Sequence, residues 1–332
     1  MSELTSIANK MVEKGKGILA ADESTPTCKK RFDSIGVDST FENRNEYRDM
    51  LFTAQNLEEY ISGVILFDET LRQATTCSEK ILFPELLNSK GIIPGIKVDM
   101  GAKVLSGFEN EKITEGLDGL RDRLKEYYNL GARFAKWRAV ITIGDNIPSD
   151  ACIYGNSHAL ARYAALCQEA GLVPIVEPEV LMDGNHTIET CYEVSQRTLN
   201  VVFEQLMMLQ VQLDGIVLKP NMIISGLGCS EQASIERVAE LTFKCLYDNV
   251  PSDVPGIAFL SGGQSSDLAT QHLNMMNKLY CDKMPWNLTF SYGRALQQDA
   301  LNSWGGSNKL EGQKSLLERA KNNSLATYGK VQ

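Results

Sequence analysis

Eight short apolar runs recur along the chain, and their spacing limits the fold more than any other feature. Each run is bounded by glycine, proline or a charged residue, and consecutive runs start 30 to 46 residues apart. That interval accommodates a strand, a helix and two loops. The runs cover residues 17–22, 63–67, 93–99, 134–141, 173–180, 215–219, 257–263 and 288–293. Eight such units predict an α/β fold with parallel pairing, closed into a (β/α)8 TIM barrel.

The stretches between these runs carry helical spacing of apolar residues. Residues 156–171 and the longer stretch 187–213 both repeat apolar side chains every three or four positions. The expected inward-facing positions are Leu160, Tyr163, Ala164 and Cys167, then Val194, Leu199, Val202, Phe203, Leu206 and Leu209. An open, doubly wound sheet is the alternative to a barrel. However, no GxGxxG follows the first run, as a dinucleotide-binding sheet would require.

The composition fits one large domain over residues 1–332. Hydrophobic residues make up 43% of the chain and charged residues 23%, which supports a large core and disfavours disorder. We expect no membrane insertion, because no apolar run is long enough to span a bilayer and residues 1–17 contain no apolar signal core. The formal net charge of −9 disfavours nucleic acid as a partner. A last helix is expected over residues 312–321.

The cysteines and histidines predict neither disulfides nor a metal site. The eight cysteines contain no CxxC pair, and we expect reduced, buried thiols in a cytoplasmic protein. The three histidines, at positions 158, 186 and 272, lie far apart and form no HxH or HExxH pattern. We therefore expect no metal centre.

One run ends in a lysine, Lys219, which Pro220 follows. At the end of a buried strand, apolar surroundings disfavour the ammonium form and lower the lysine pKa, so a neutral amine becomes accessible near pH 7. Carbonyl chemistry through a Schiff base needs such an amine. The alternative is a lysine whose apolar stem packs on the strand while its charge reaches solvent.

Charged residues also end other runs, and a barrel would gather them at one mouth, where the C-terminal ends of its strands meet. Lys136 and Arg138 share one face of their strand, and Glu177 and Glu179 share a face in the same way. Further candidates at this mouth are Asp22, Lys97, Asp99, Ser261, Gly262, Gly263 and Arg294. Charges inside barrel strands are unfavourable unless paired, so their recurrence favours a functional site.

These residues fit carbonyl chemistry on a phosphorylated substrate. Lys97 and Lys136 would lower the pKa of Lys219 further, and Asp22 and Glu177 could divide the acid and base roles. Loops that follow the seventh and eighth runs hold phosphate in many barrels, which suits Ser261, Gly262, Gly263 and Arg294. A second phosphate could be held after the first run, by Ser24, Thr27, Lys30 and Arg31.

Seven segments also occur in an order and spacing that resemble a known enzyme family. They are ILAADES, GIKVD, FAKWR, VEPEV, LKPNM, FLSGGQ and FSYGRAL, and the similarity runs over about residues 7–326. They resemble the signature segments of class I fructose-1,6-bisphosphate aldolases. The resemblance implies a cytosolic homotetramer that folds as a (β/α)8 barrel and needs no metal. It would cleave fructose 1,6-bisphosphate reversibly to dihydroxyacetone phosphate and glyceraldehyde 3-phosphate, in glycolysis and gluconeogenesis. Members of the family can also bind cytoskeletal or adhesin tails.

The resemblance implies roles for individual residues. Lys219 would form the Schiff base, Glu177 would be the main general acid and base, and Asp22 would deprotonate the hydroxyl beside the breaking bond. Glu179 would support Glu177 and pair with neighbouring lysines. The implied substrate contacts are Lys97, Lys136 and Arg138, with Ser261, Gly262, Gly263 and Arg294 at the phosphate of the dihydroxyacetone half and Ser24, Thr27 and Arg31 at the other phosphate.

The chain departs from the family pattern in two places. Family members usually end in a flexible tail with a terminal tyrosine, and here Gln332 stands where that tail would begin. Tyr328 does not align with that tyrosine, so we expect the catalytic tail to be missing, which would affect proton exchange on the enamine rather than bond cleavage. The second departure is Pro-Thr-Cys at residues 26–28, in the loop of the second phosphate site.

Two other functions compete with this interpretation. Another Schiff-base barrel, such as a transaldolase or a deoxyribose-phosphate aldolase, would keep the lysine but need one phosphate site. A binding or scaffold protein would need no catalytic set at all. The presence of Asp22, Lys136, Glu177 and Lys219 together argues against a purely structural role.

Overall fold

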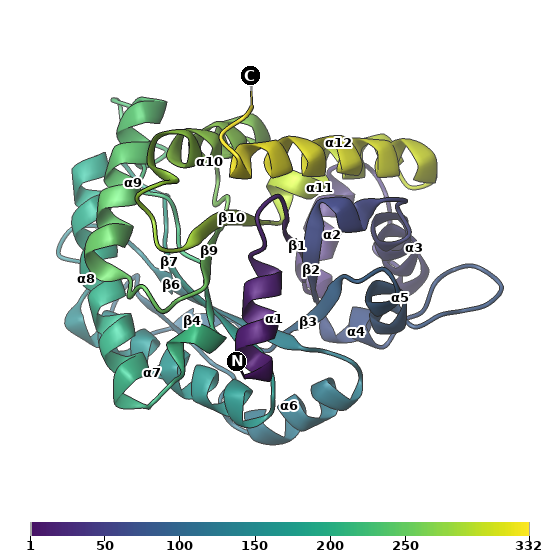
Figure 1. Ribbon diagram of the computed structural model, residues 1–332, viewed down its shortest axis with the longest axis horizontal. Helices are drawn as coiled ribbons and strands as arrows, with labels where there is room; N and C mark the ends of the chain where they lie inside the picture. Colours follow the sequence, from purple (N-terminus) through teal and green to yellow (C-terminus); the bar gives the residue numbers. More distant parts are fainter. Residues whose placement is uncertain (1, 332) are drawn as a thin grey trace.

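The computed structural model describes residues 2–331, and eight of its strands form a closed parallel barrel (Figure 1). Around the barrel the order is β1-β10-β9-β8-β7-β6-β3-β2. The strands are β1 (Gly17–Ala21), β2 (Ile61–Leu66), β3 (Ile93–Lys97), β6 (Phe134–Ile141), β7 (Val173–Val180), β8 (Val217–Leu218), β9 (Gly256–Phe259) and β10 (Asn287–Tyr292). Closure confirms the predicted barrel and rules out the open sheet.

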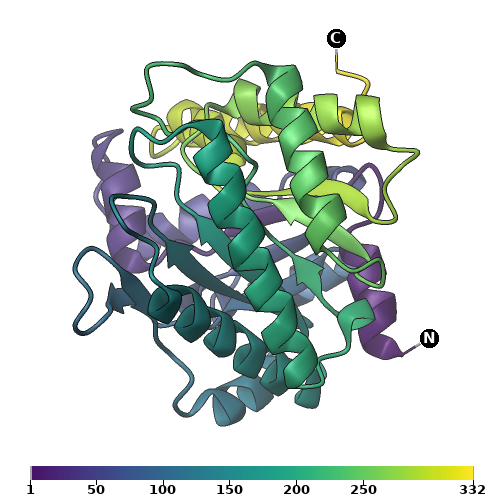
Figure 2. The same cartoon turned by 90° about the vertical axis from the view of Figure 1, so that its left-hand side faces the viewer.

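The helices lie outside the strands and mostly alternate with them along the chain. They are α2 (Thr25–Asp33), α3 (Phe41–Phe52), α4 (Asp68–Leu71), α5 (Phe83–Ser89), α6 (Leu120–Asn129), α7 (Asp150–Glu169), α8 (Ile188–Met208), α9 (Ile235–Asn249), α10 (Ser266–Tyr280), α11 (Arg294–Trp304) and α12 (Lys309–Thr327). Figure 2 shows α8 and α9 side by side on the outer surface. The helices expected over 156–171, 187–213 and 312–321 correspond to α7, α8 and the middle of α12.

Two elements differ from the sequence-based prediction. A two-stranded hairpin, β4 (Ala102–Val104) and β5 (Lys112–Thr114), follows β3 and was not predicted. In addition, β8 is only two residues long. Proline has no backbone N–H and cannot donate to a strand ladder, and Pro220 follows Lys219 directly. The run over 215–219 therefore ends as a strand before its lysine.

Apolar side chains fill the barrel interior near the N-terminal ends of the strands, and α1 (Glu3–Met11) covers this end of the barrel (Figure 1). Phe134 lies inside, beside Gly95, where a Cβ would lie only 2.2 Å from the phenylalanine ring. Glycine is therefore required at position 95 to make room for Phe134. The interior cluster includes Ala8, Met11, Val12, Ile18, Ile65, Ile93, Phe134, Val173, Ile175, Val217 and Ala258.

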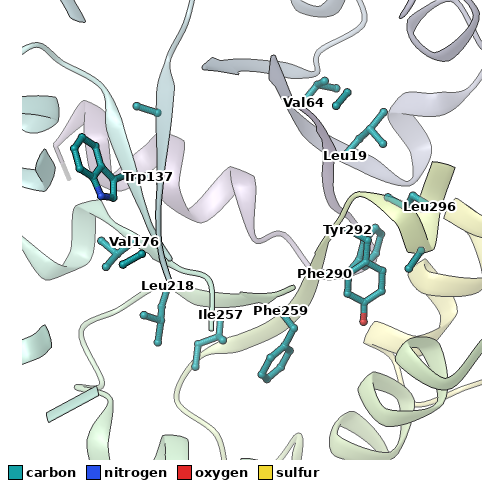
Figure 3. Packing of buried hydrophobic residues seen from close by; sticks show 14 of the residues in the cluster. Leu19, Val64, Trp137, Val176, Leu218, Ile257, Phe259, Phe290, Tyr292 and Leu296 are labelled. Atoms are coloured by element: carbon teal, nitrogen blue, oxygen red, sulfur yellow. The ribbon is translucent and has the colours of Figure 1, made fainter. Parts of the chain in front are cut away.

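The opposite faces of the strands pack against the helices in the larger core (Figure 3). Trp137 belongs to this core and packs on Tyr163 of α7, with ring centroids 5.6 Å apart. Phe134 points inward and Trp137 outward, so Lys136 and Arg138 share the inner face with Phe134. Likewise Val173 and Ile175 place Glu177 and Glu179 inside. The shared faces predicted from the sequence are confirmed.

The predicted burial patterns hold in most positions. The four inward-facing positions of residues 156–171 are buried. Of the six positions predicted over 187–213, only Val194 in α8 and Leu209 just after its end are half-exposed. All eight cysteines are free thiols. Five of them are buried, but Cys77 and Cys281 are exposed and Cys229 is half-buried, so the expectation of burial was wrong for these three. Within residues 2–331, no helix combines the length and apolarity needed to cross a bilayer.

Candidate active site

A cavity of about 420 Å³ opens at the C-terminal ends of the barrel strands. Residues that lie far apart in the sequence meet there because each follows or ends a strand. The predicted site residues that line it are Asp22, Ser24, Thr27, Arg31, Lys97, Asp99, Lys136, Arg138, Glu177, Glu179, Lys219, Ser261, Gly262 and Arg294. Gly263 and Lys30 are absent from this lining, and Lys30 is exposed on α2.

Lys219 lines the cavity and is almost fully buried, with 3% of its surface exposed. Its Nζ is 3.3 Å from Oε1 of Glu177, and its backbone N–H donates to the carbonyl of Val176 at 2.8 Å. Burial lowers the pKa of Lys219, and the nearby charge of Lys136 lowers it further, while Glu177 opposes both effects. The snorkelling alternative is therefore wrong, because the amine faces a buried carboxylate.

Lys136 links two carboxylates. Its Nζ lies 2.8 Å from Oδ2 of Asp22 and 3.4 Å from Oε2 of Glu177. Burial alone would lower the pKa of Lys136, but these two carboxylates outweigh it and the pKa is raised. Lys136 therefore stays protonated and orders a chain of charges that runs from Asp22 through Glu177 to Lys219.

Asp22 is held as a carboxylate. Burial would raise its pKa, but the attraction of Lys136, Lys219 and Lys97 is stronger in sum, and the pKa is lowered well below its usual range. A group that stays ionised at neutral pH can accept a proton but cannot donate one. Asp22 is therefore suited to the base role.

Lys97 and Arg138 stand on the same side of the cavity. Lys97 Nζ pairs with Oδ1 of Asp99 at 2.7 Å, and Asp99 also accepts the backbone N–H of Arg138 at 3.3 Å. The Arg138 guanidinium pairs with the Glu179 carboxylate. Glu179 was expected to pair with lysines, and this was wrong, because it pairs with Arg138. The register places residue 138 beside residue 177, so Glu179, two residues further on the same inner face of β7, is a diagonal neighbour of the arginine.

The loops after β9 and β10 form one rim of the cavity. Gly262 has φ +57°, a conformation that favours glycine, and its carbonyl accepts a 2.7 Å hydrogen bond from Arg294 Nη2. Arg294 is the first residue of α11, so the N-terminus of this helix opens at the same rim. Backbone N–H groups at a helix N-terminus together with an arginine are suited to bind an anion. Gly263 faces away, since its N–H donates to Sδ of Met182 at 2.7 Å.

The second candidate phosphate site lies at the start of α2. Ser24 precedes this helix, and its hydroxyl lies 3.1 Å from that of Thr27. Thr27 and Arg31 are four residues apart and so share one face of α2. Pro26 occupies the first turn, where a missing N–H breaks no helical hydrogen bond. The departure from the family pattern at residues 26–28 is thus compatible with the helix.

Two residues at or behind the cavity, Glu23 and Asn221, were not predicted to take part in the site. Glu23 lines the cavity and lies two residues after the end of β1, a position that the sequence pattern does mark. Asn221 lies behind it: its Oδ1 accepts the N–H of Val180 at 3.0 Å and continues the contact between β7 and the segment after β8. Strand β8 ends at Leu218, so the side-chain oxygen of Asn221, in place of a backbone carbonyl, accepts this N–H.

No three His, Cys, Asp or Glu side chains of residues 2–331 come together in an arrangement that could hold a metal ion. His158 and His272 instead lie beside glutamines, at 3.0 Å from Gln205 and 2.6 Å from Gln264. The cavity itself is lined by lysines, arginines and carboxylates.

Comparison with known proteins agrees with this geometry. Residues 3–332 match the family model described as fructose-bisphosphate aldolase class-I. The chain belongs to this family. It is 56% identical over 333 residues to a probable fructose-bisphosphate aldolase class 1 of Xanthomonas campestris, covering 99% of this chain and 98% of that protein. It is 52% identical to the cytosolic fructose-bisphosphate aldolase 4 of Arabidopsis thaliana, covering 95% and 80%.

The fold agrees equally well with a solved aldolase structure. The fructose-bisphosphate aldolase of Plasmodium falciparum, in complex with TRAP and a small-molecule inhibitor, superimposes with a TM-score of 0.97. That chain is 50% identical, and the match covers 99% of this chain and 95% of that one. The chain is accordingly a class I fructose-bisphosphate aldolase, and the transaldolase and deoxyribose-phosphate aldolase alternatives are set aside.

Proposed function

We propose that this aldolase cleaves fructose 1,6-bisphosphate through a Schiff base on Lys219. The observation that supports this most directly is the buried Lys219 amine with its lowered pKa, 3.3 Å from Glu177, inside a cavity with two anion-binding rims. A lowered pKa raises the fraction of neutral amine at neutral pH, and the neutral amine is the nucleophile.

The first half of the reaction forms the imine. The Lys219 nitrogen attacks the C2 carbonyl of the open-chain sugar, and the carbonyl oxygen takes up a proton to give a carbinolamine. Glu177 then gives a proton to the departing hydroxyl, which leaves as water, and the nitrogen lone pair forms the protonated imine. Glu177 receives this proton from the Lys219 ammonium, 3.3 Å away, when the amine becomes neutral before its attack, so Lys136 keeps its own proton. The proton on the carbinolamine oxygen is the one that the attacking nitrogen gives up.

The second half breaks the carbon–carbon bond. Asp22, ionised by its three neighbouring lysines, takes the proton from the C4 hydroxyl. The C3–C4 electron pair moves into the protonated imine, which releases glyceraldehyde 3-phosphate and leaves an enamine on Lys219. Protonation of the enamine at C3 and hydrolysis of the imine then return dihydroxyacetone phosphate and the free amine.

The two rims give the substrate its orientation in this proposal. Ser261, Gly262 and Arg294 would hold the phosphate of the dihydroxyacetone half, and Ser24, Thr27 and Arg31 would hold the other phosphate. Binding energy from two phosphates fixes the reacting carbons between Lys219 and Asp22. Lys97, Arg138 and Glu179 would contact the sugar or fix the charges around it.

The test is cleavage of fructose 1,6-bisphosphate, followed by coupled oxidation of NADH by the triose phosphates. Lys219→Met should lose at least about 10³-fold in kcat. A matched control is Lys90→Met. Lys90 is a half-buried lysine whose pKa is also lowered by burial, but it lies outside the cavity. The control should keep kcat within about twofold. Equal activity of wild type and Lys219→Met would contradict the proposal.

Metal independence and assembly are proposals with their own tests. Activity should survive exhaustive treatment with EDTA, because the proposed steps need an amine and carboxylates alone. We also propose that the protein is cytoplasmic and assembles as a homotetramer. Light scattering on the purified protein, which measures molar mass, would test the tetramer.

A second candidate function is binding of a cytoskeletal or adhesin tail at the cavity mouth. It is favoured by the solved P. falciparum aldolase, which was captured in complex with TRAP. A peptide partner that uses the cavity should be displaced by fructose 1,6-bisphosphate in a competition assay. A partner that binds unchanged at saturating substrate would place its site elsewhere.

A further inference from the structure

Glu23 is a buried carboxylate that the proposed mechanism does not use. It follows Asp22, lines the cavity and has 9% of its surface exposed. Its two oxygens are both engaged: Oε1 lies 2.5 Å from Nη1 of Arg31, and Oε2 lies 2.7 Å from Nη2 of Arg48. Burial would raise the pKa of Glu23, but the two arginines outweigh it and lower the pKa, so the group stays ionised.

Arg48, the partner of Glu23 on the side away from the cavity, is buried. Arg48 belongs to α3, and its side chain is 2% exposed. Gln297 of α11 donates from Nε2 to Oε1 of Glu23 at 3.0 Å and to the carbonyl of Ala20 at 2.6 Å. Its Oε1 accepts the hydroxyl of Tyr47 at 3.0 Å. Glu23 is therefore fixed to the end of β1, to α3 and to α11 at once.

The near side faces the substrate. Arg31 lines the cavity on α2, and its side chain is 18% exposed. The pair with Glu23 uses Nη1, which leaves the other N–H groups of the guanidinium for a ligand. Arginine has several rotatable bonds, and ordering them on binding opposes affinity. A fixed carboxylate that holds the guanidinium in one place removes much of that loss before the ligand arrives.

We infer that Glu23 is a positioning residue for the second phosphate: it holds Arg31 in the orientation that meets this group and thereby sets the preference for a bisphosphate over a monophosphate. The inference rests on the proposed function, in which Arg31 contacts the phosphate distal to the dihydroxyacetone half. Glu23 acts through Arg31 and does not touch the reacting carbons. A substrate without the distal phosphate should therefore be insensitive to Glu23.

The experiment compares kcat/KM for fructose 1,6-bisphosphate and fructose 1-phosphate in wild type, Glu23→Gln, Arg31→Ala and the double variant. Glutamine keeps the size of Glu23 but removes the charge that holds two arginines. We expect Glu23→Gln to lower kcat/KM for the bisphosphate about tenfold, mainly through KM, with fructose 1-phosphate changed less than about twofold. In the Arg31→Ala background the same change should have no further effect on the ratio between the substrates.

A matched control comes from the same helix α3. Arg44 pairs with Glu69 at 2.7 Å, and both side chains are largely buried, but neither lines the cavity. Glu69→Gln should leave the ratio between the two substrates unchanged. Because Arg48 would be left buried without an anion, Glu23→Gln combined with Arg48→Met serves as a second variant that removes both charges and leaves Arg31 in place.

Four results would overturn the inference: an unchanged substrate ratio in both Glu23 variants, an equal loss on both substrates, a raised preference for the bisphosphate, or an additive effect of Glu23→Gln in the Arg31→Ala background. The proposed function is tested separately by Arg31→Ala alone. If that variant keeps the wild-type ratio, Arg31 does not hold the distal phosphate and the assignment of that site fails. If Arg31→Ala abolishes the preference for the bisphosphate in kcat/KM and both Glu23 variants retain that preference, the inference about Glu23 fails while the proposed function stands.

Discussion

Removal of the Lys136 ammonium should uncouple the charge chain in the cavity. In Lys136→Met, the carboxylates of Asp22 and Glu177 lose the cation that lies 2.8 and 3.4 Å from them. Removing one partner of a buried pair destabilises a protein by about 3–5 kcal/mol, and Lys219 and Lys97 remain near Asp22, so we expect the lower end, about 3 kcal/mol. The measurement is urea unfolding at pH 7.

The same substitution should change the pH dependence in a defined direction. The wild-type pKa of Asp22 is lowered, so its ionised form stabilises the fold above the unfolded pKa, and this contribution is lost as pH falls through the folded value. Without Lys136, burial raises the pKa of Asp22 against weaker opposition. The stability deficit of the variant should therefore be largest at neutral pH and shrink on acidification as the carboxylates take up protons.

Activity should follow the same logic. Asp22 must be ionised to accept the hydroxyl proton, so the acid limb of the kcat profile should move to higher pH in Lys136→Met, with kcat reduced about 10²–10⁴-fold at its maximum. Lys90→Met is the control, because Lys90 is a half-buried lysine outside the cavity whose Nζ donates to the carbonyl of Ala54 at 2.6 Å. An acid limb and an unfolding free energy equal to those of wild type would refute the coupling described here.

Four further predictions follow from single contacts. Gly262→Ala should raise KM and lower the melting temperature. A Cβ at this position would lie 1.6 Å from Cε of Met182, and the φ of +57° strains a residue with a side chain, at a cost of about 1–3 kcal/mol. Wild-type values of KM and melting temperature would contradict this prediction. Asn221→Ala should lower the free energy of unfolding by about 1–3 kcal/mol, since the buried N–H of Val180 loses its acceptor; an unchanged urea midpoint would speak against it. Burial lowers the pKa of His272 to about 4. The free energy of unfolding should therefore fall as pH drops from about 6.5 to 4, by up to about 3 kcal/mol. His272→Gln should make the free energy of unfolding less dependent on pH in this range, and an unchanged pH dependence would contradict the assignment. Dialysis against EDTA should leave kcat unchanged, and restoration of lost activity by added zinc would argue for a metal route.

The barrel could be predicted well from the sequence because strand formation follows a local pattern of apolar residues. Strand β7 and strand β6 were placed to the residue, since each is an apolar run of eight residues with inward positions two apart. The side-chain faces followed from the same period: Phe134 and Lys136 must share a face. Strand β8 was predicted too long because the apolar pattern continues to Lys219 although the ladder does not.

Several features of the site depend on contacts that no local pattern records. Glu179 pairs with Arg138 on the neighbouring strand, and only the register of β6 against β7 decides this. Glu23 meets Arg48 on α3 and Gln297 on α11, which lie 25 and 274 residues further along the chain. Gly263 turns away from the cavity because Met182, from the loop after β7, takes its N–H. Such outcomes follow from packing between distant segments.

The central claim is that Lys219 forms a covalent imine with the sugar, and reductive trapping tests it most directly. The protein is incubated with fructose 1,6-bisphosphate, treated with borohydride, digested and mapped by mass spectrometry. We predict one stable adduct, on the peptide that contains Lys219, and its loss in Lys219→Met. An adduct on another lysine, or cleavage that continues in wild type with no adduct at all, would contradict the account.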